Sequence, residues 1–344
     1  MNDYTNILKE LDFSLDEKQP HLGGERRVFA AHKLVLFGRR NSDGIRVVVK
    51  VSREAEGIKE IERERVCRAA LDGISFAYGT FSSPEELLFS KKDGYAIQVT
   101  RFIDQDISFL ERSTPEQFGF ALKGLKAMEA AHAATYGHLR SIRGIFPTMN
   151  AGNYIKTFRD YVKEISSEFT ETQRALSSAA NHLSDNYEDI ERYCGFLTHF
   201  DFLPQNIRIA GDTMYLLDHS SLRFGNKHES WARMINFMEL YNTGLARALE
   251  KYVRDNRSSE EVESLHLMRL FRLGELLAHH ARVGADALDD NLRELSRKRV
   301  SFWSRVLQSV FDNTTVPDNV ISEYKTARDS LRSPEEKERQ IGLH

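Results

Sequence analysis

Hydrophobic and polar positions follow a strand-like pattern over roughly the first hundred residues. Residues 45–51 are β-branched almost throughout and give the strongest strand signal in the chain. Residues 34–37 and 95–100 are expected to form further strands, and residues 41–44 have turn chemistry. Between positions 58 and 71 apolar residues recur at helical spacing in a charged stretch, which predicts one exposed helix.

After about residue 105 the pattern becomes helical. Ser113 as a hydroxyl cap, Pro115 in the first turn and Gln117 placed to close a capping box predict a helix start. Apolar stripes at helical spacing then continue to about residue 310. The strand-like interruption is a hairpin over 206–217, embedded in the helical part.

These patterns predict an α+β protein with two lobes. Residues 1–103 are expected to form a strand-rich lobe with one main helix and a small antiparallel sheet. Residues 104–326 are expected to form a larger, mostly helical lobe. Residues 327–344 are polar and are expected to form a tail that frays.

Composition and charge exclude several classes of protein. The 344 residues are 41% hydrophobic and 29% charged, as in an ordinary soluble globular protein, and the formal net charge of −3 gives no reason to expect a nucleic-acid partner. No apolar run is long enough to predict a membrane span, and the first residues do not resemble a signal peptide. The two cysteines, Cys67 and Cys194, predict buried small hydrophobic residues in a reducing cytoplasm.

The chemistry concentrates around the predicted hairpin. Asp201 is followed five residues later by Asn206, and Asp218 stands at the end of the returning strand. Phosphoryl transfer requires an acceptor hydroxyl aimed in line and neutralised phosphate charge. The Asp201 carboxylate could orient that hydroxyl and accept its proton, whereas the oxygens of Asn206 and Asp218 suit Mg²⁺, a cation that prefers oxygen ligands. His199 is expected to support the loop structurally. For His219 two roles are possible, contact with the substrate or packing.

Lys50 is the single lysine within the apolar strand 45–51, where burial without a partner would be costly. A lysine on a strand that pairs with a glutamate of the next helix and reaches nucleotide phosphates is the second half of a kinase site. The predicted helix offers four candidate partners: Glu56, Glu60, Glu62 and Glu64.

Over residues 20–310 the sequence resembles the aminoglycoside phosphotransferase family, whose kinase-like fold includes choline, homoserine and methylthioribose kinases. The resemblance rests on residues 199–206, on Asp218 and on Lys50. It implies a two-lobed protein-kinase-like fold, with the nucleotide in the first lobe and the catalytic loop and substrate pocket in the second.

The resemblance also implies a role for each site residue. Asp201 would be the catalytic base, Asn206 and Asp218 the Mg²⁺ ligands, and Lys50 the ligand of the α- and β-phosphates, with Glu64 as its partner and Glu60 as the alternative. The backbone that begins at Thr100 and includes Phe102 would bind adenine, and the loop containing Gly23 and Gly24 would cover the phosphates.

The expected function is therefore transfer of the γ-phosphate of ATP, or GTP, to a hydroxyl of an unidentified small molecule. Two alternatives are a protein Ser/Thr kinase and a non-catalytic nucleotide-binding scaffold. Protein Ser/Thr kinases place a lysine two residues after the loop aspartate, where this chain has Leu203. The complete set of Lys50, Asp201, Asn206 and Asp218 disfavours the scaffold.

Overall fold

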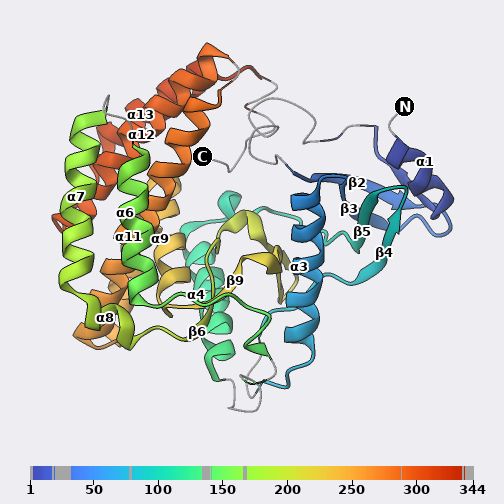
Figure 1. Ribbon diagram of the computed structural model, residues 1–344, viewed down its shortest axis with the longest axis horizontal. Coiled ribbons are helices and arrows are strands. Elements are labelled where there is room, and N and C mark those ends of the chain that lie inside the picture. Colours follow the sequence, from blue (N-terminus) through green and yellow to red (C-terminus); the bar gives the residue numbers. More distant parts are fainter. Residues whose placement is uncertain are drawn as a thin grey trace. The chain divides into compact units, whose positions relative to one another are not determined.

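The computed structural model describes residues 3–17, 19, 32–76, 80–133, 140, 142–165, 169–287, 289–334 and 337. The chain divides into two compact units (Figure 1). The first contains Met1–Ser75, Phe81–Ser108 and Asn206–Ser221, and the second contains Phe76–Thr80, Phe109–Gln205 and Leu222–His344. The predicted α+β class is confirmed.

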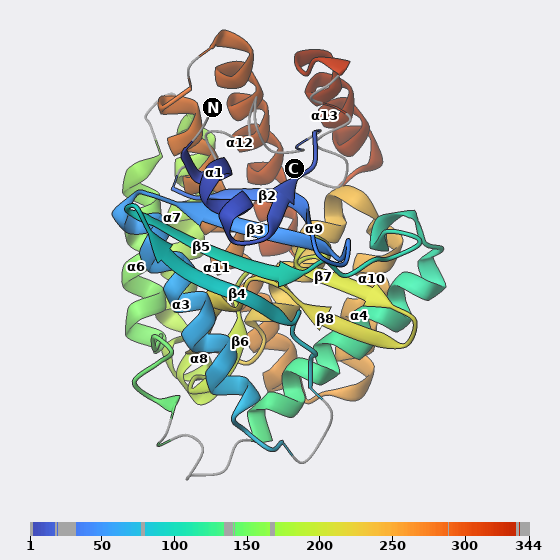
Figure 2. The same ribbon diagram turned by 90° about the vertical axis from the view of Figure 1, so that its right-hand side faces the viewer.

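The first unit is built on a five-stranded antiparallel sheet in the order β1-β2-β3-β5-β4. Figure 2 shows β2, β3, β5 and β4 side by side in this order. The apolar face of the sheet packs against helix α1, with Leu8, Leu36 and Val49 fully buried in that core. Helix α3 packs against β3 and β5. The elements are α1 (Asp3–Glu10), β1 (Phe13–Leu15), β2 (Leu34–Arg40), β3 (Arg46–Ser52), α3 (Ala55–Asp72), β4 (Glu86–Lys92) and β5 (Tyr95–Arg101).

The hairpin belongs to this first unit, not to the helical part as predicted. It consists of β7 (Ile207–Ala210) and β8 (Thr213–Leu216), preceded by the turn η4 (Pro204–Asn206) and followed by η5 (His219–Ser221). The reason is backbone pairing over a long sequence separation. Ser82 donates to Met214 at 3.1 Å and accepts from Leu216 at 3.0 Å, and α3 packs against η5.

The second unit is helical, and α11 (Ser259–Ala285) packs against α6, α9 and α12. Gly274 allows α6 to approach α11 closely, because a Cβ there would stand 2.2 Å from the ring of Phe158. The other elements are η1 (Phe109–Glu111), α4 (Thr114–Ala130), η2 (Ala131–Ala133), α6 (Ala151–Glu164), α7 (Thr170–Asp185), α8 (Tyr187–Arg192), β6 (Phe196–His199), β9 (Leu222–Gly225), α9 (Glu229–Tyr241), α10 (Thr243–Asn256), α12 (Asp290–Phe311) and α13 (Asp318–Leu331).

Two local predictions in this unit are wrong. Glu116, not Gln117, closes the capping box with Ser113, because Glu116 is the third helical residue. The polar tail predicted from 327 begins too early, because α13 continues to Leu331. Within the described parts of the chain, no helix combines the length and the apolar character needed to cross a bilayer.

Candidate active site

Lys50 and Glu64 form an ion pair inside the first unit. Lys50 lies on β3 and Glu64 on α3, and the lysine Nζ stands 2.5 Å from Oε1 of Glu64. The two side chains are only 15% and 6% exposed, so burial of either charge without the other would destabilise the fold. Glu60, the alternative partner, instead pairs with Lys33 at 3.1 Å. The partner expected for Lys50 is therefore present.

Lys33 connects this ion pair electrostatically to Asp218. Burial alone would lower the pKa of the Lys33 ammonium, but the carboxylates of Asp218, Glu64 and Glu60 raise it above its usual value. Asp218 and Glu64 therefore act on the same buried ammonium group. Lys33 was not predicted from the sequence, because its position directly before a strand carries no distinguishing signal.

The hairpin brings the backbones of Asn206 and Asp218 together. Ile207 pairs with Leu216, and the amide of Leu217 donates to the carbonyl of Asn206 at 2.8 Å. Asn206 and Asp218 therefore flank the open end of one short ladder. This local geometry follows from a four-residue strand on each side of a tight turn.

Asp218 adopts a backbone conformation that residues other than glycine rarely occupy, with φ of +54°. Its carboxylate accepts hydrogen bonds from the hydroxyls of Ser220 at 2.5 Å and Ser221 at 2.7 Å. The next residue, His219, is buried and lies 3.1 Å from the hydroxyl of Ser83 through Nε2. Such strained positions cost free energy and are concentrated at functional sites.

Asp201 belongs to the second unit, where it follows strand β6. The backbone N–H and carbonyl of His199 both bond to the hydroxyl of Ser230, each at 3.1 Å. Phe202 and Leu203 are fully buried, which fixes the loop after Asp201. His199 is also fully buried, in agreement with its expected supporting role.

Arg233 on α9 contacts the Asp201 carboxylate. Its Nε and Nη2 donate to Oδ1 at 3.0 and 2.9 Å, and the arginine side chain is 11% exposed. A guanidinium holds a carboxylate in a defined orientation because its donors are fixed in one plane. Arg233 was not predicted from the sequence, because it stands 32 residues after Asp201 and no local pattern links the two.

The remaining predicted residues fall in two groups. Thr100 lies within β5 opposite Val48, and the amide of Phe102 donates to the carbonyl of Arg46 at 2.9 Å. That amide is therefore already used within the sheet, and any nucleotide contact from this residue would involve another group. Gly23 and Gly24 lie outside the described residues.

No protein-family model matches the sequence, and no curated protein matches it. Solved structures of similar fold do exist. The GDP complex of aminoglycoside 2'-phosphotransferase-IIIa is 14% identical, covers 88% of this chain and 96% of its own, and has a TM-score of 0.62. A thermostable mutant of aminoglycoside phosphotransferase APH(4)-Ia is 15% identical, with coverage of 87% and 97% and a TM-score of 0.61.

A third similar structure is macrolide 2'-phosphotransferase MphH from Brachybacterium faecium. It is 11% identical, covers 87% of this chain and 98% of its own, and has a TM-score of 0.55. These similarities span nearly the whole chain in each case. The chain therefore has the kinase-like fold of the aminoglycoside and macrolide phosphotransferases, and the predicted resemblance is confirmed at the level of the fold.

Proposed function

We propose that this protein is a small-molecule kinase that transfers the γ-phosphate of ATP or GTP to a hydroxyl group in a Mg²⁺-dependent reaction. The observation that carries the proposal is the hairpin. It brings the backbone of Asn206 next to that of Asp218, which has a strained conformation. The carboxylates of Asp218 and Glu64 both act electrostatically on Lys33, and Glu64 is also the ion-pair partner of Lys50. Because one fold can support many different reactions, the fold alone, without these residues, would not indicate nucleotide chemistry.

The first unit supplies the groups for the nucleotide. Lys50, held by Glu64, is assigned to the α- and β-phosphates. The amide oxygen of Asn206 and the carboxylate of Asp218 are assigned to Mg²⁺. No cluster of three His, Cys, Asp or Glu side chains suited to a metal occurs in the described part of the chain. Two protein oxygens nevertheless fit Mg²⁺, which takes its other ligands from phosphates and water. When bound, Mg²⁺ would neutralise charge on the phosphates.

The second unit supplies the base. Asp201 is assigned to orient the acceptor hydroxyl and to take up its proton as the hydroxyl oxygen bonds to the γ-phosphorus. The bond between that phosphorus and the β-phosphate oxygen breaks, and the nucleoside diphosphate leaves with the bonding electrons. Arg233 is a positioning residue in this scheme, because its two hydrogen bonds orient the Asp201 carboxylate.

The similar structures support both substrates of the proposed reaction. One is described as a complex with GDP and kanamycin, and another as a ternary complex with ADP and hygromycin B. They suggest a purine nucleotide together with a hydroxyl-bearing small molecule, and they do not favour ATP over GTP.

The direct test is formation of ADP or GDP from the triphosphate in the presence of Mg²⁺. It is measured with amino sugars, amino alcohols, sugars and nucleosides as acceptors, with a generic protein substrate, and without an acceptor. The proposal expects acceptor-dependent release with at least one small molecule and none with the protein substrate. Turnover of the protein substrate alone would replace the proposal with a protein kinase.

A further inference from the structure

The turn after β6 consists of Phe200 and Asp201, which lie between two fixed points of the backbone. On one side, the backbone N–H and carbonyl of His199 both bond to the hydroxyl of Ser230. On the other side, Phe202 is fully buried. Phe200 and Asp201 are themselves partly exposed, so the orientation of the turn depends on what these two side chains contact.

Two guanidiniums lie against the ring of Phe200. The Cζ atom of Arg223, on β9, is 4.8 Å from the ring centroid, and that of Arg272, on α11, is 5.8 Å from it. A guanidinium within about 6 Å of a ring centroid is attracted by the quadrupole of the ring. The arginine side chains are only 13% and 4% exposed, so water screens this attraction little. The ring is therefore held from two separate elements.

A fully buried carboxylate holds both arginines in place. Glu229, the first residue of α9, accepts from Nε of Arg223 at 3.1 Å and from Nη1 of Arg272 at 3.3 Å. The hydroxyl of Tyr154 donates to the same carboxylate at 2.9 Å. Burial alone would raise the pKa of Glu229, but the two guanidiniums hold it below its usual value. The carboxylate is therefore charged at neutral pH.

Arg233, which contacts Asp201, stands one helical turn after Glu229. Residues four apart share one face of a helix, so α9 acts on the turn through both side chains. Glu229 acts on Phe200 through its arginines, and Arg233 acts on Asp201 directly. A buried ion network is weak evidence for stability, since apolar packing often stabilises a core as well. A role in fixing geometry would explain why these charges are buried.

Helix α11 lies along the same turn. Arg272 contacts the Phe200 ring, and His279, seven residues later, is within electrostatic reach of Asp201. Burial and three nearby guanidiniums lower the pKa of His279 to about 4, so its imidazole is neutral at pH 7. His279 therefore adds no positive charge at the turn, and Arg272 is the cation through which α11 contacts Phe200.

We infer that Phe200 is a positioning residue: its ring, held by Arg223 and Arg272, fixes the turn so that the Asp201 carboxylate meets the acceptor hydroxyl in line. The inference rests on the proposed function. A misplacement of about 1 Å can reduce a rate roughly 10²-fold, so loosening this ring should lower kcat. The groups assigned to the nucleotide belong to the other unit, so the KM for the nucleotide should not change.

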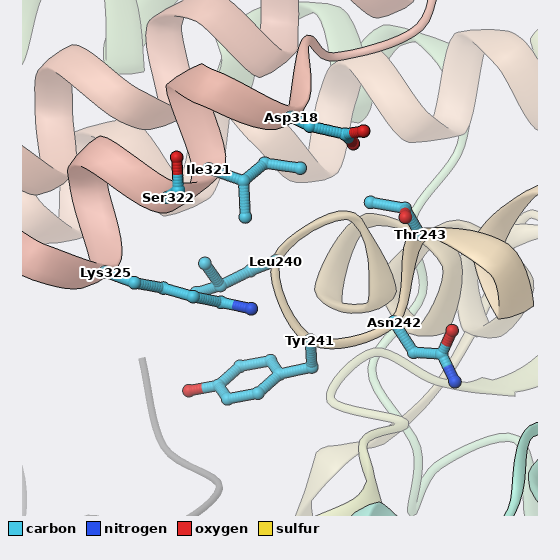
Figure 3. A pocket seen from close by; sticks show the side chains of 8 residues that line it. All are labelled: Leu240, Tyr241, Asn242, Thr243, Asp318, Ile321, Ser322 and Lys325. Atoms are coloured by element: carbon cyan, nitrogen blue, oxygen red, sulfur yellow. The ribbon is translucent and has the colours of Figure 1, made fainter.

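The far end of α9 offers an internal comparison. Tyr241, the last residue of the helix, stands about 12 Å along the axis from Arg233 and stacks on Phe237 with the ring centroids 4.4 Å apart. It borders a pocket of about 400 Å³ (Figure 3), whose described lining contains one cation, Lys325, and one carboxylate, Asp318. Substitution of Tyr241 therefore removes an aromatic contact of α9 at a distance from the turn.

The test compares Phe200→Leu with Phe200→Tyr. Leucine is apolar but has no ring for the guanidiniums, whereas tyrosine keeps the ring. We expect the kcat of Phe200→Leu to fall roughly tenfold or more, with the KM for the nucleotide unchanged. Phe200→Tyr should keep kcat close to the wild-type value. Nucleoside diphosphate release measures both constants.

Phe120→Leu is the matched control. Phe120 is a partly exposed ring on α4 with the Cζ atom of Arg112 4.9 Å from its centroid, so the same kind of contact is lost outside the turn. Tyr241→Leu is a second control, on α9 itself. Melting temperatures verify that the variants fold. Both controls should leave kcat unchanged even where the melting temperature falls.

A second readout does not need turnover. The Nε–H of Arg233 donates to Asp201 at 3.0 Å, and it can be observed by NMR in protein made with isotope-labelled arginine. Arg233→Lys assigns its signal. Exchange of this proton with solvent should become roughly tenfold faster in Phe200→Leu, because a loosened turn opens the hydrogen bond more often. The tyrosine variant and both controls should exchange at the wild-type rate.

A kcat or an exchange rate that Phe200→Leu leaves unchanged would overturn the inference. Equal losses in Phe200→Tyr or in Phe120→Leu would also overturn it. Failure of the proposed function looks different, because the wild-type protein would then bind no nucleotide and release no diphosphate. In that case exchange of the Arg233 proton still decides whether Phe200 orients the Asp201 carboxylate.

Discussion

The two regions that hold the candidate site residues differ in the balance of their charges. In the first unit, Lys50 and Lys33 face three carboxylates, those of Glu64, Glu60 and Asp218. In the second unit, the Asp201 carboxylate is matched by one guanidinium, that of Arg233. An acidic excess suits a divalent cation, whereas a matched pair holds a carboxylate in one orientation. Each region is formed by side chains within its own unit.

The two regions also differ in how they are built. The nucleotide side uses a strand, the following helix and a hairpin that is closed by a tight turn. The acceptor side draws on the loop after β6 and on α9, which are joined by the contact of Arg233 with Asp201 over 32 residues of sequence. This difference between the two regions determines which substitutions should abolish catalysis and which should only change nucleotide affinity or stability.

The largest effect is expected from Asp201→Asn. The amide keeps the size of the side chain but is a far weaker proton acceptor, so kcat should fall roughly 10²- to 10⁴-fold while nucleotide binding persists. Single-turnover kinetics with calorimetric nucleotide titration measures both quantities. Asp212→Asn, in the exposed hairpin turn, is the control. Near-full activity of Asp201→Asn would refute the base assignment.

Asp218→Gly should separate function from stability. Glycine accepts positive φ without strain, which offsets the loss of the hydrogen bonds from Ser220 and Ser221, so the free energy of unfolding should change by less than about 1 kcal/mol. Loss of the carboxylate should nevertheless weaken Mg²⁺-nucleotide binding by roughly tenfold or more. Urea unfolding measures the free energy of unfolding, and calorimetric titration measures the affinity for the Mg²⁺-nucleotide. Unchanged nucleotide affinity would remove Asp218 from the metal site.

Glu64→Gln and Glu60→Gln form a matched pair on the same helix. Glu64→Gln leaves the buried Lys50 without a charged partner and should cost roughly 2–4 kcal/mol of stability together with nucleotide affinity. Glu60 is 46% exposed, so Glu60→Gln should cost under about 1 kcal/mol. Equal effects of the two changes on unfolding in urea would contradict the pairing as described.

The smallest effect concerns pH. The folded-state pKa of His279 is about 4, below its value of about 6.5 in an unfolded chain, so the unfolded state binds more protons between these values. Stability should therefore fall as pH drops from 6.5 to 4. His279→Gln should flatten this dependence by about 2 kcal/mol across the window. An identical pH profile in urea unfolding would show that His279 is not held neutral.

The parts of the site that sequence could predict were those set by short stretches of chain. A lysine in a β-branched run, the spacing of Asp201 from Asn206 and the hairpin before Asp218 are all local features. Lys33 and Arg233 carry no such signal, because their importance depends on which carboxylate the fold brings to them. The placement of the hairpin with the sheet was missed for the same reason, since it depends on Ser82 pairing with β8.

The central claim is that Asn206 and Asp218, with Lys50 and Glu64, hold a magnesium nucleotide. Calorimetric titration of ADP and GDP with and without Mg²⁺ tests it most directly. The account predicts binding of at least one diphosphate, strengthened by Mg²⁺ in the wild-type protein and no longer strengthened in Asp218→Ala. Absence of nucleotide binding, or binding that Mg²⁺ leaves unchanged, would contradict it.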